Sequence, residues 1–283
     1  MGRLDGKVAV ITQAGSSFGR VLAHAYAREG AILFLQDWEE RRAQLEANAA
    51  SITSEGGQVF AGVYDIVTGI ETARMTADVM EKFGRVDVLV NTAMQGGHGI
   101  IFDITEDKWD LCIDRGLKSY FLTCQHLGEQ MARVGYGKII NLTSIIADLG
   151  SGGAVPWGAC RGGVNALTFA VAQGLGEYGI RCVALARGPV QSTAYTEEAL
   201  KERQVRIPFG RLGKEDDLIG PAVFLATSDS DWVNGSVLYC EGGYAHAAAN
   251  DAVTRATEVP LKRKGKMMDA PTSEVIWLDK ESY

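Results

Sequence analysis

Residues 8–20 read VAVITQAGSSFGR, a short apolar run that passes through a turn rich in small residues into a helical pattern. A strand that leads through such a turn into a helix is the opening unit of a doubly wound α/β domain. The first N–H groups of such a helix have no partner within the helix, so they can face an anion. This stretch therefore predicts a parallel sheet whose ligand site lies at the carboxyl ends of the strands.

The alternation of apolar runs and helical patterns continues from residue 7 to about 240. Strands are expected at 8–12, 32–37, 58–64, 86–91, 137–143, 181–186 and 236–240. Helices are expected at about 18–29, 39–54, 68–83, 106–133, 155–178 and 214–227. The pattern predicts one doubly wound α/β domain over residues 1–244, with a seven-stranded parallel sheet.

Two segments depart from this alternation. Residues 190–210 form a loop with a short helical pattern at 197–204, in the position of a lid over a substrate. Residues 245–283 are a C-terminal extension that contains the apolar run from Val275 to Leu278. Apolar side chains of this kind gain by leaving water, so we expect the extension to pack at a subunit interface.

Composition narrows the classes of partner. The net charge of −7 and the pI of about 5.2 argue against a nucleic-acid surface. No apolar run approaches the roughly 20 residues that span a bilayer, and the first residues lack the apolar core of a signal peptide. The five cysteines have no metal-ligand spacing, which favours reduced thiols in the cytoplasm and no metal site. A small molecule is the expected partner, with neither nucleic acid nor membrane.

The first turn resembles that of the short-chain dehydrogenase/reductase family, a Rossmann-type fold in which it reads Thr-Gly-x-x-x-Gly-Ile-Gly. Thr12 and Gly19 match this pattern, whereas Gln13 and Ser17 replace the first two glycines. Those glycines permit a tight turn and let the backbone approach a pyrophosphate, so a Cβ at both positions narrows the cradle. The resemblance implies that Thr12, Ser17, Phe18 and Gly19 contact a dinucleotide.

The same resemblance assigns further cofactor positions. Asp37 ends the second strand about 20 residues after the turn, where a carboxylate binds the ribose diol of NAD and repels the phosphate of NADP. Asp37 could instead cap the helix that follows it. The other positions implied are Asp65 and Ile66 at the adenine, Asn91 after the fourth strand, and Gly188, Val190 and Thr193 at the nicotinamide. Together they predict NAD as the cofactor and, as in the family, a homo-dimer or homo-tetramer.

The catalytic positions match the family in spacing but not in residue type. Ser144 stands thirteen residues before Trp157, and Arg161 follows four residues later, where the family has Ser, Tyr and Lys. Gly116 stands where the family has an Asn that relays protons. An indole N–H donates a hydrogen bond but does not titrate, and a guanidinium stays protonated. The resemblance implies that Ser144 and Trp157 polarise a substrate oxygen, while Arg161 bonds the cofactor ribose.

Other side chains could supply a proton or bind the substrate. His98 follows the fourth strand in a glycine-rich loop, and histidine is the natural acid–base residue type, so His98 is a candidate catalytic acid or base; the alternative is a solvated histidine. Asp148 and Tyr195 are weaker candidates. Arginines stand at three strand-end positions, Arg115, Arg161 and Arg187, and with His98 they predict a pocket for an anionic ligand.

Three functions remain open at this point. The first is an NAD-dependent oxidoreductase with an atypical Ser-Trp-Arg site, acting on a small alcohol or ketone. The second is a redox-neutral lyase or dehalogenase-like enzyme, because the spacing of Ser144, Trp157 and Arg161 also partly resembles the haloalcohol dehalogenases. Those relatives keep a Tyr, which this chain lacks. The third is a nucleotide-binding pseudoenzyme.

Overall fold

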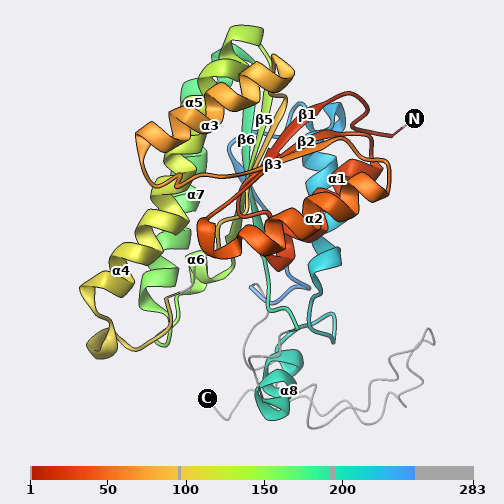
Figure 1. Ribbon diagram of the computed structural model, residues 1–283. Coiled ribbons are helices and arrows are strands. Elements are labelled where there is room, and N and C mark those ends of the chain that lie inside the picture. Colours follow the sequence, from red (N-terminus) through yellow and green to blue (C-terminus); the bar gives the residue numbers. More distant parts are fainter. Residues whose placement is uncertain (1, 95–96, 192–195, 246–283) are drawn as a thin grey trace, which may run out of the picture.

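The computed structural model describes residues 2–94, 97–191 and 196–245 (Figure 1). Its centre is a seven-stranded, all-parallel sheet in the order β3-β2-β1-β4-β5-β6-β7. The strands are β1 (Val8–Ile11), β2 (Ile32–Asp37), β3 (Val59–Val63), β4 (Val88–Asn91), β5 (Gly137–Ser144), β6 (Ile180–Arg187) and β7 (Ser236–Cys240). The predicted single doubly wound sheet is confirmed, and the order reverses between β1 and β4.

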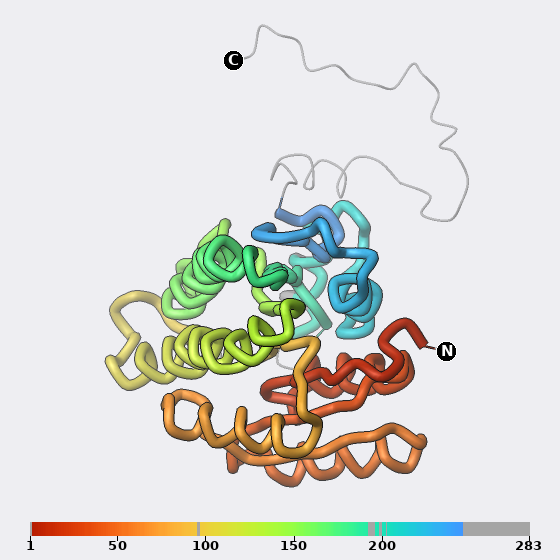
Figure 2. Tube along the Cα trace, turned by 90° about the horizontal axis from the view of Figure 1, so that it is seen from above, coloured from red at the N-terminus to blue at the C-terminus, as the bar shows by residue number. Residues whose placement is uncertain are grey.

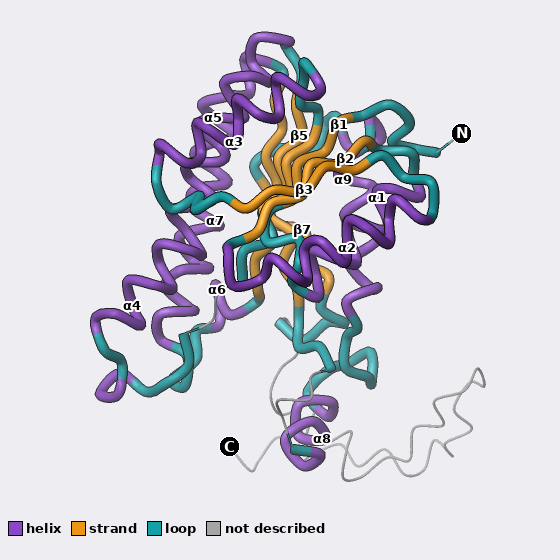
Figure 3. Tube along the Cα trace, viewed as in Figure 1, coloured by secondary structure: helices purple, strands orange, loops and turns teal. Residues whose placement is uncertain are grey.

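Helices cover both faces of the sheet (Figures 2 and 3). They are α1 (Ser17–Arg28), α2 (Arg42–Ser54), α3 (Gly69–Phe83), α4 (Glu106–Ile113), α5 (Ser119–Val134), α6 (Ile146–Leu149), α7 (Val155–Leu175), α8 (Glu197–Val205) and α9 (Ile219–Ala226). One core cluster joins the sheet to α1, α2 and α9, and a second joins it to α3, α5 and α7. None of the helices in the described ranges is long and apolar enough to cross a membrane.

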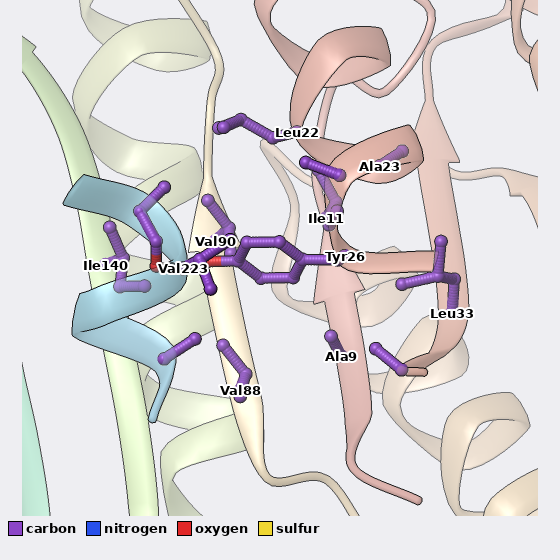
Figure 4. Close-up of a cluster of buried hydrophobic side chains, with 14 of the residues drawn as sticks. Ala9, Ile11, Leu22, Ala23, Tyr26, Leu33, Val88, Val90, Ile140 and Val223 are labelled. Carbon is purple, nitrogen blue, oxygen red and sulfur yellow. Dashed lines mark hydrogen bonds between the residues drawn. The ribbon is translucent and has the colours of Figure 1, made fainter. Parts of the chain in front are cut away.

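Local sequence explains how these elements begin and pack. Ser16 caps α1 by accepting the N–H of Gly19 on its side chain at 3.1 Å. The ring of Tyr26 lies across β1 and β4 toward Val223 of α9 (Figure 4). Its hydroxyl donates to the carbonyl of Ala222 at 2.8 Å, so the one polar atom of this buried ring has a partner.

One predicted helix is divided. The pattern over 106–133 predicts a single helix, but the structure has α4, a π-helical turn at Asp114–Lys118, and α5. Such wide turns are uncommon and often mark functional sites. The helix predicted at 197–204 is α8, whereas residues 246–283 of the predicted interface extension lie outside the described residues.

Candidate active site

A cavity of about 930 Å³ lies beyond the carboxyl ends of β5 and β6, the end of the sheet where α6 and α8 lie (Figure 1). Its lining includes Ser144, Trp157, His98, Arg187, Arg203 and Arg206. The structure therefore brings together three of the four predicted catalytic residues and leaves Arg161 out. A smaller neighbouring cavity, about 240 Å³, is lined by Gly188 and Val190 among others.

Ser144 is the last residue of β5. Its register pairs it with Arg187 at the end of β6, so both side chains reach the cavity from adjacent strands. The Ser144 hydroxyl oxygen accepts the N–H of Ile146 at 3.4 Å. Accepting this bond does not use the hydroxyl proton, so Ser144 can donate it to an oxygen in the cavity.

Arg161 lies beneath the cavity wall and has no exposed surface. Its guanidinium donates to the carbonyl oxygens of Gly116 at 2.8 Å, Leu142 at 3.1 Å and Ala93 at 3.2 Å. It also lies 4.5 Å from the centre of the Trp157 ring, which covers it. From this position the guanidinium cannot reach a ribose, which corrects the expectation that Arg161 replaces the family lysine in that contact.

Gly116 and Arg161 depend on each other. A Cβ at position 116 would lie 2.6 Å from Nη2 of Arg161 and 2.5 Å from Sγ of Cys160, closer than real Cβ contacts allow. The π-helical turn presents the Gly116 carbonyl directly to that nitrogen. The sequence showed two separate replacements at these positions, and only the structure shows that the arginine occupies the space of a side chain at 116.

A thiol completes the surroundings of this buried cation. Nη2 of Arg161 lies 3.1 Å from Sγ of Cys160. Hydrogen bonding with Cys112, together with the adjacent guanidinium, holds the pKa of the Cys160 thiol below its usual range. The Cys160 thiol also donates to the carbonyl of Cys112 at 3.5 Å, so it lies between that carbonyl and the guanidinium.

Comparison with known proteins places the chain. The model of a family described as Enoyl-(Acyl carrier protein) reductase matches residues 13–245. The L-rhamnose-1-dehydrogenase of Scheffersomyces stipitis is 34% identical over 251 residues, 86% of this chain and 97% of that protein. The 3-oxoacyl-(acyl-carrier-protein) reductase FabG of Staphylococcus epidermidis is 32% identical over 240 residues, 84% and 98% of the two chains. The chain belongs to the short-chain dehydrogenase/reductase family.

A solved structure agrees with this membership. The gluconate 5-dehydrogenase from Burkholderia cenocepacia, in complex with NADP and tartrate, matches with a TM-score of 0.83 and 29% identity. The match covers 87% of this chain and 98% of that one. The chain is therefore an oxidoreductase by family. A nicotinamide dinucleotide would lie along the edge formed by the carboxyl ends of the strands.

The adenosine half of that edge, at the ends of β2 and β3, is partly filled by the chain itself. Asp37 is fully buried, and its carboxylate accepts the N–H groups of Gly15 and Trp38, each at 2.8 Å. Asp65 accepts the indole N–H of Trp38 at 3.1 Å. Both carboxylates predicted to bind adenosine thus bond groups of the chain, although the Asp65 side chain is itself exposed. An adenosine group could therefore reach the buried Asp37 carboxylate only if the groups bonded to it moved apart.

The turn after β1 is partly filled as well. Gln13, at the position of the first family glycine, has a φ of 48°, a left-handed conformation that favours glycine. Its side-chain oxygen accepts the N–H of Met94 at 2.8 Å and so bridges the turn and the loop after β4. Thr12 and Asn91 are buried partners of Thr92 and Asn141, and they hold β1, β4 and β5 together.

The nicotinamide half is more open. Gly188 and Val190 line the smaller cavity, and the Phe18 ring lies 5.3 Å from the Arg187 guanidinium, between α1 and the end of β6. Ile66 is buried in the core, whereas Ser17 is exposed at the start of α1. Thr193 and Tyr195 lie outside the described residues.

The predicted cluster of arginines is only partly correct. Arg187 lines the cavity, but Arg115 forms an ion pair with Glu40 and lies over the Trp38 ring, so it belongs to the adenosine half. Arg203 and Arg206 were not predicted. They come from α8 and the residues just after it, and their spacing of three within the lid segment was the signal that could have found them.

The buried Asp37 should make stability depend on pH. Burial raises its pKa to about 6, against the lowering effect of the N–H groups of Trp38 and Gly15. The folded protein then binds a proton more tightly than the unfolded chain, whose Asp titrates near about 3.9. The free energy of unfolding should therefore fall by roughly 2–3 kcal/mol as pH rises from about 4 to about 6.

Urea unfolding at a series of pH values from 4 to 7 measures how the free energy of unfolding changes with pH. Asp37→Asn should flatten this dependence, whereas Asp229→Asn, at an exposed carboxylate, should leave it unchanged. A pH dependence identical in Asp37→Asn and the natural chain would contradict the expectation.

Proposed function

We propose that this chain is a nicotinamide-dependent oxidoreductase with an atypical site, which interconverts a small hydroxy acid and the corresponding oxo acid. The observation that carries the proposal is that Arg187, Arg203 and Arg206 line the same cavity as Ser144. Guanidinium groups bind carboxylates through directional, charge-assisted hydrogen bonds. The related gluconate 5-dehydrogenase was solved with tartrate, a hydroxy acid, and this supports an acid as ligand.

The side chains that line the cavity have different proposed roles. The arginines hold the carboxylate, and the Ser144 hydroxyl donates a hydrogen bond to the reacting oxygen. Trp157 adds an N–H donor and a wall but no titrating proton. His98 lines the same cavity and carries an imidazole, a side chain that can both give and accept a proton, so it is the proposed source or acceptor of the proton.

NAD is the proposed cofactor, because a 2′-phosphate at the end of β2 would meet the Asp37 carboxylate as a like charge. A homo-dimer or homo-tetramer is proposed because Trp109 and Leu111 of α4 and Phe121 of α5 are apolar and exposed. The five free cysteines are typical of a reducing compartment, so a cytoplasmic location is also proposed.

Turnover tests the proposal. NADH and NADPH are offered with small 2-oxo acids and with neutral ketones of matched size. We expect slow NADH oxidation that favours the acids. Arg187→Leu should raise KM for the acids by about tenfold or more, the loss of one charge-assisted contact, without raising KM for the ketones.

Arg133→Leu, at an exposed arginine near the end of α5, is the matched control and should change neither value. Equal use of acids and ketones would contradict the acid specificity. Turnover of neither class, in a protein that binds the nucleotide, would instead favour a pseudoenzyme or a redox-neutral reaction.

A further inference from the structure

The side chain of Trp38 lies where a dinucleotide would place its adenine. In a doubly wound sheet the adenosine half of the ligand lies across the ends of the strands on the β2 side of the switch point. Trp38 directly follows β2, is only 3% exposed, and packs in the core cluster that contains Tyr64 and Ile66 of the β3 end. Its Nε1–H donates to Asp65, the first acidic side chain after β3.

The outer side of the indole is also covered. The Arg115 guanidinium lies 4.8 Å from the centre of the Trp38 ring and is held there by an ion pair with Glu40. A cation over the face of an indole is attracted by the electrons of the ring. Trp38 is therefore enclosed between the core and a cation, with its single polar atom bonded.

The space for the adjoining ribose is closed by the same arrangement. The Asp37 carboxylate, which would accept ribose hydroxyls, instead accepts the N–H groups of Gly15 and Trp38. A Cβ on Gly15 would lie 2.9 Å from Oδ2 of Asp37 and 3.1 Å from the backbone nitrogen of Leu45, so α2 packs directly on the turn. Ribose could enter only if these groups separate.

We propose that Trp38 is a built-in plug of the adenosine half of the site, in which the indole takes the place of a purine. Both are flat, two-ring systems with an N–H donor at the edge, and Asp65 accepts that donor. The proposal rests on the proposed function, because it states how the cofactor enters the same site. A dinucleotide binds only the fraction of molecules in which Trp38 has left.

The plug lowers the affinity for a dinucleotide in proportion to the fraction of molecules in which Trp38 has left the site. When the competent state is a fraction f of the population, the apparent dissociation constant is the intrinsic one divided by f. A competent fraction of about one tenth weakens binding about tenfold, and removing the plug restores that factor. The effect is confined to ligands that carry adenosine, since the nicotinamide half does not contact Trp38.

Binding to the full chain tests this, with three probes: NADH, ADP-ribose and nicotinamide mononucleotide. Trp38→Ala should bind NADH and ADP-ribose about tenfold or more tightly than the natural chain, with unchanged affinity for the mononucleotide. Trp38→Phe keeps a ring in the core but cannot bond Asp65, so it should give a smaller gain and carries the test if the alanine variant is unstable. Trp232→Ala, at a fully exposed tryptophan, is the matched control and should change nothing.

Two results would overturn the plug. One is equal affinity of the natural chain and both Trp38 variants for ADP-ribose. The other is a gain of the same size for nicotinamide mononucleotide, which would show that the effect is not confined to the adenosine half. Tighter nucleotide binding by the Trp38 variants without turnover supports the plug and refutes the proposed function, whereas acid turnover with no gain in nucleotide affinity in either Trp38 variant does the reverse.

Discussion

Gly116→Asn and Arg161→Lys should each destabilise the protein strongly, and the two together should cost much less than their sum. Asparagine at 116 forces a Cβ onto a guanidinium that three carbonyl oxygens hold in place, an overpacking worth about 1–3 kcal/mol. Lysine at 161 cannot reach all of those oxygens, at about 1–3 kcal/mol for each one left unpaired. In the double variant the amide fills the space that the guanidinium leaves, so we expect a favourable coupling of about 0.5–3 kcal/mol.

Urea unfolding of the natural chain, both single variants and the double variant gives this coupling. Gly174→Asn is the matched control, because a Cβ at that glycine of α7 meets no atom within 4 Å. Gly174→Asn should change the free energy of unfolding only by the difference in helix propensity between glycine and asparagine. It should show no coupling to Arg161→Lys. Additive effects of Gly116→Asn and Arg161→Lys would mean that the two positions are independent.

In that double-variant background, Trp157→Tyr should raise turnover by about 10²–10⁴-fold, the usual effect of a positioned general acid. Trp157 lines the cavity that also holds Ser144, so a phenol there would present a titrating hydroxyl to the substrate oxygen. The single change should do little, because catalytic groups that act as a unit give no additive gains.

Steady-state rates with the 2-oxo acid panel measure the effect, and the triple variant with Phe at 157 is the control that adds a ring without a proton. Equal rates for the Tyr and Phe variants would show that position 157 does not carry the proton. Rates unaffected by Trp157→Phe in the natural chain would support His98 as the source of the proton.

Local sequence was enough for the elements that its pattern specifies. β2 and β7 have the predicted bounds, and the ends of the other strands differ from prediction by one or two residues. Buried parallel strands appear in the sequence as apolar runs, and surface helices have apolar residues every three to four positions. Both patterns can be recognised within a short stretch of sequence. The division of the helix expected at 106–133 was not visible, since the π-helical turn accompanies a contact between Gly116 and Arg161 across 45 residues.

The same contrast holds for the site. Ser144, Trp157 and His98 line one cavity as predicted, because strand ends in a parallel sheet meet at one edge whatever their side chains are. The direction in which a long side chain turns at that edge depends on its neighbours. Arg161 turns inward to three carbonyl oxygens, and Arg115 turns away to Glu40 and Trp38.

The sequence by itself determined the sheet, its ligand-binding edge and the residue types at that edge. Only the tertiary structure decided which of those residues face a ligand and which face the chain. Asp37 stands where a cofactor would need it, yet it is buried and bonded to the N–H groups of Gly15 and Trp38. The physical reason is that a buried carboxylate must be hydrogen-bonded, and whether its partner is a ligand or the protein depends on contacts between segments distant in sequence.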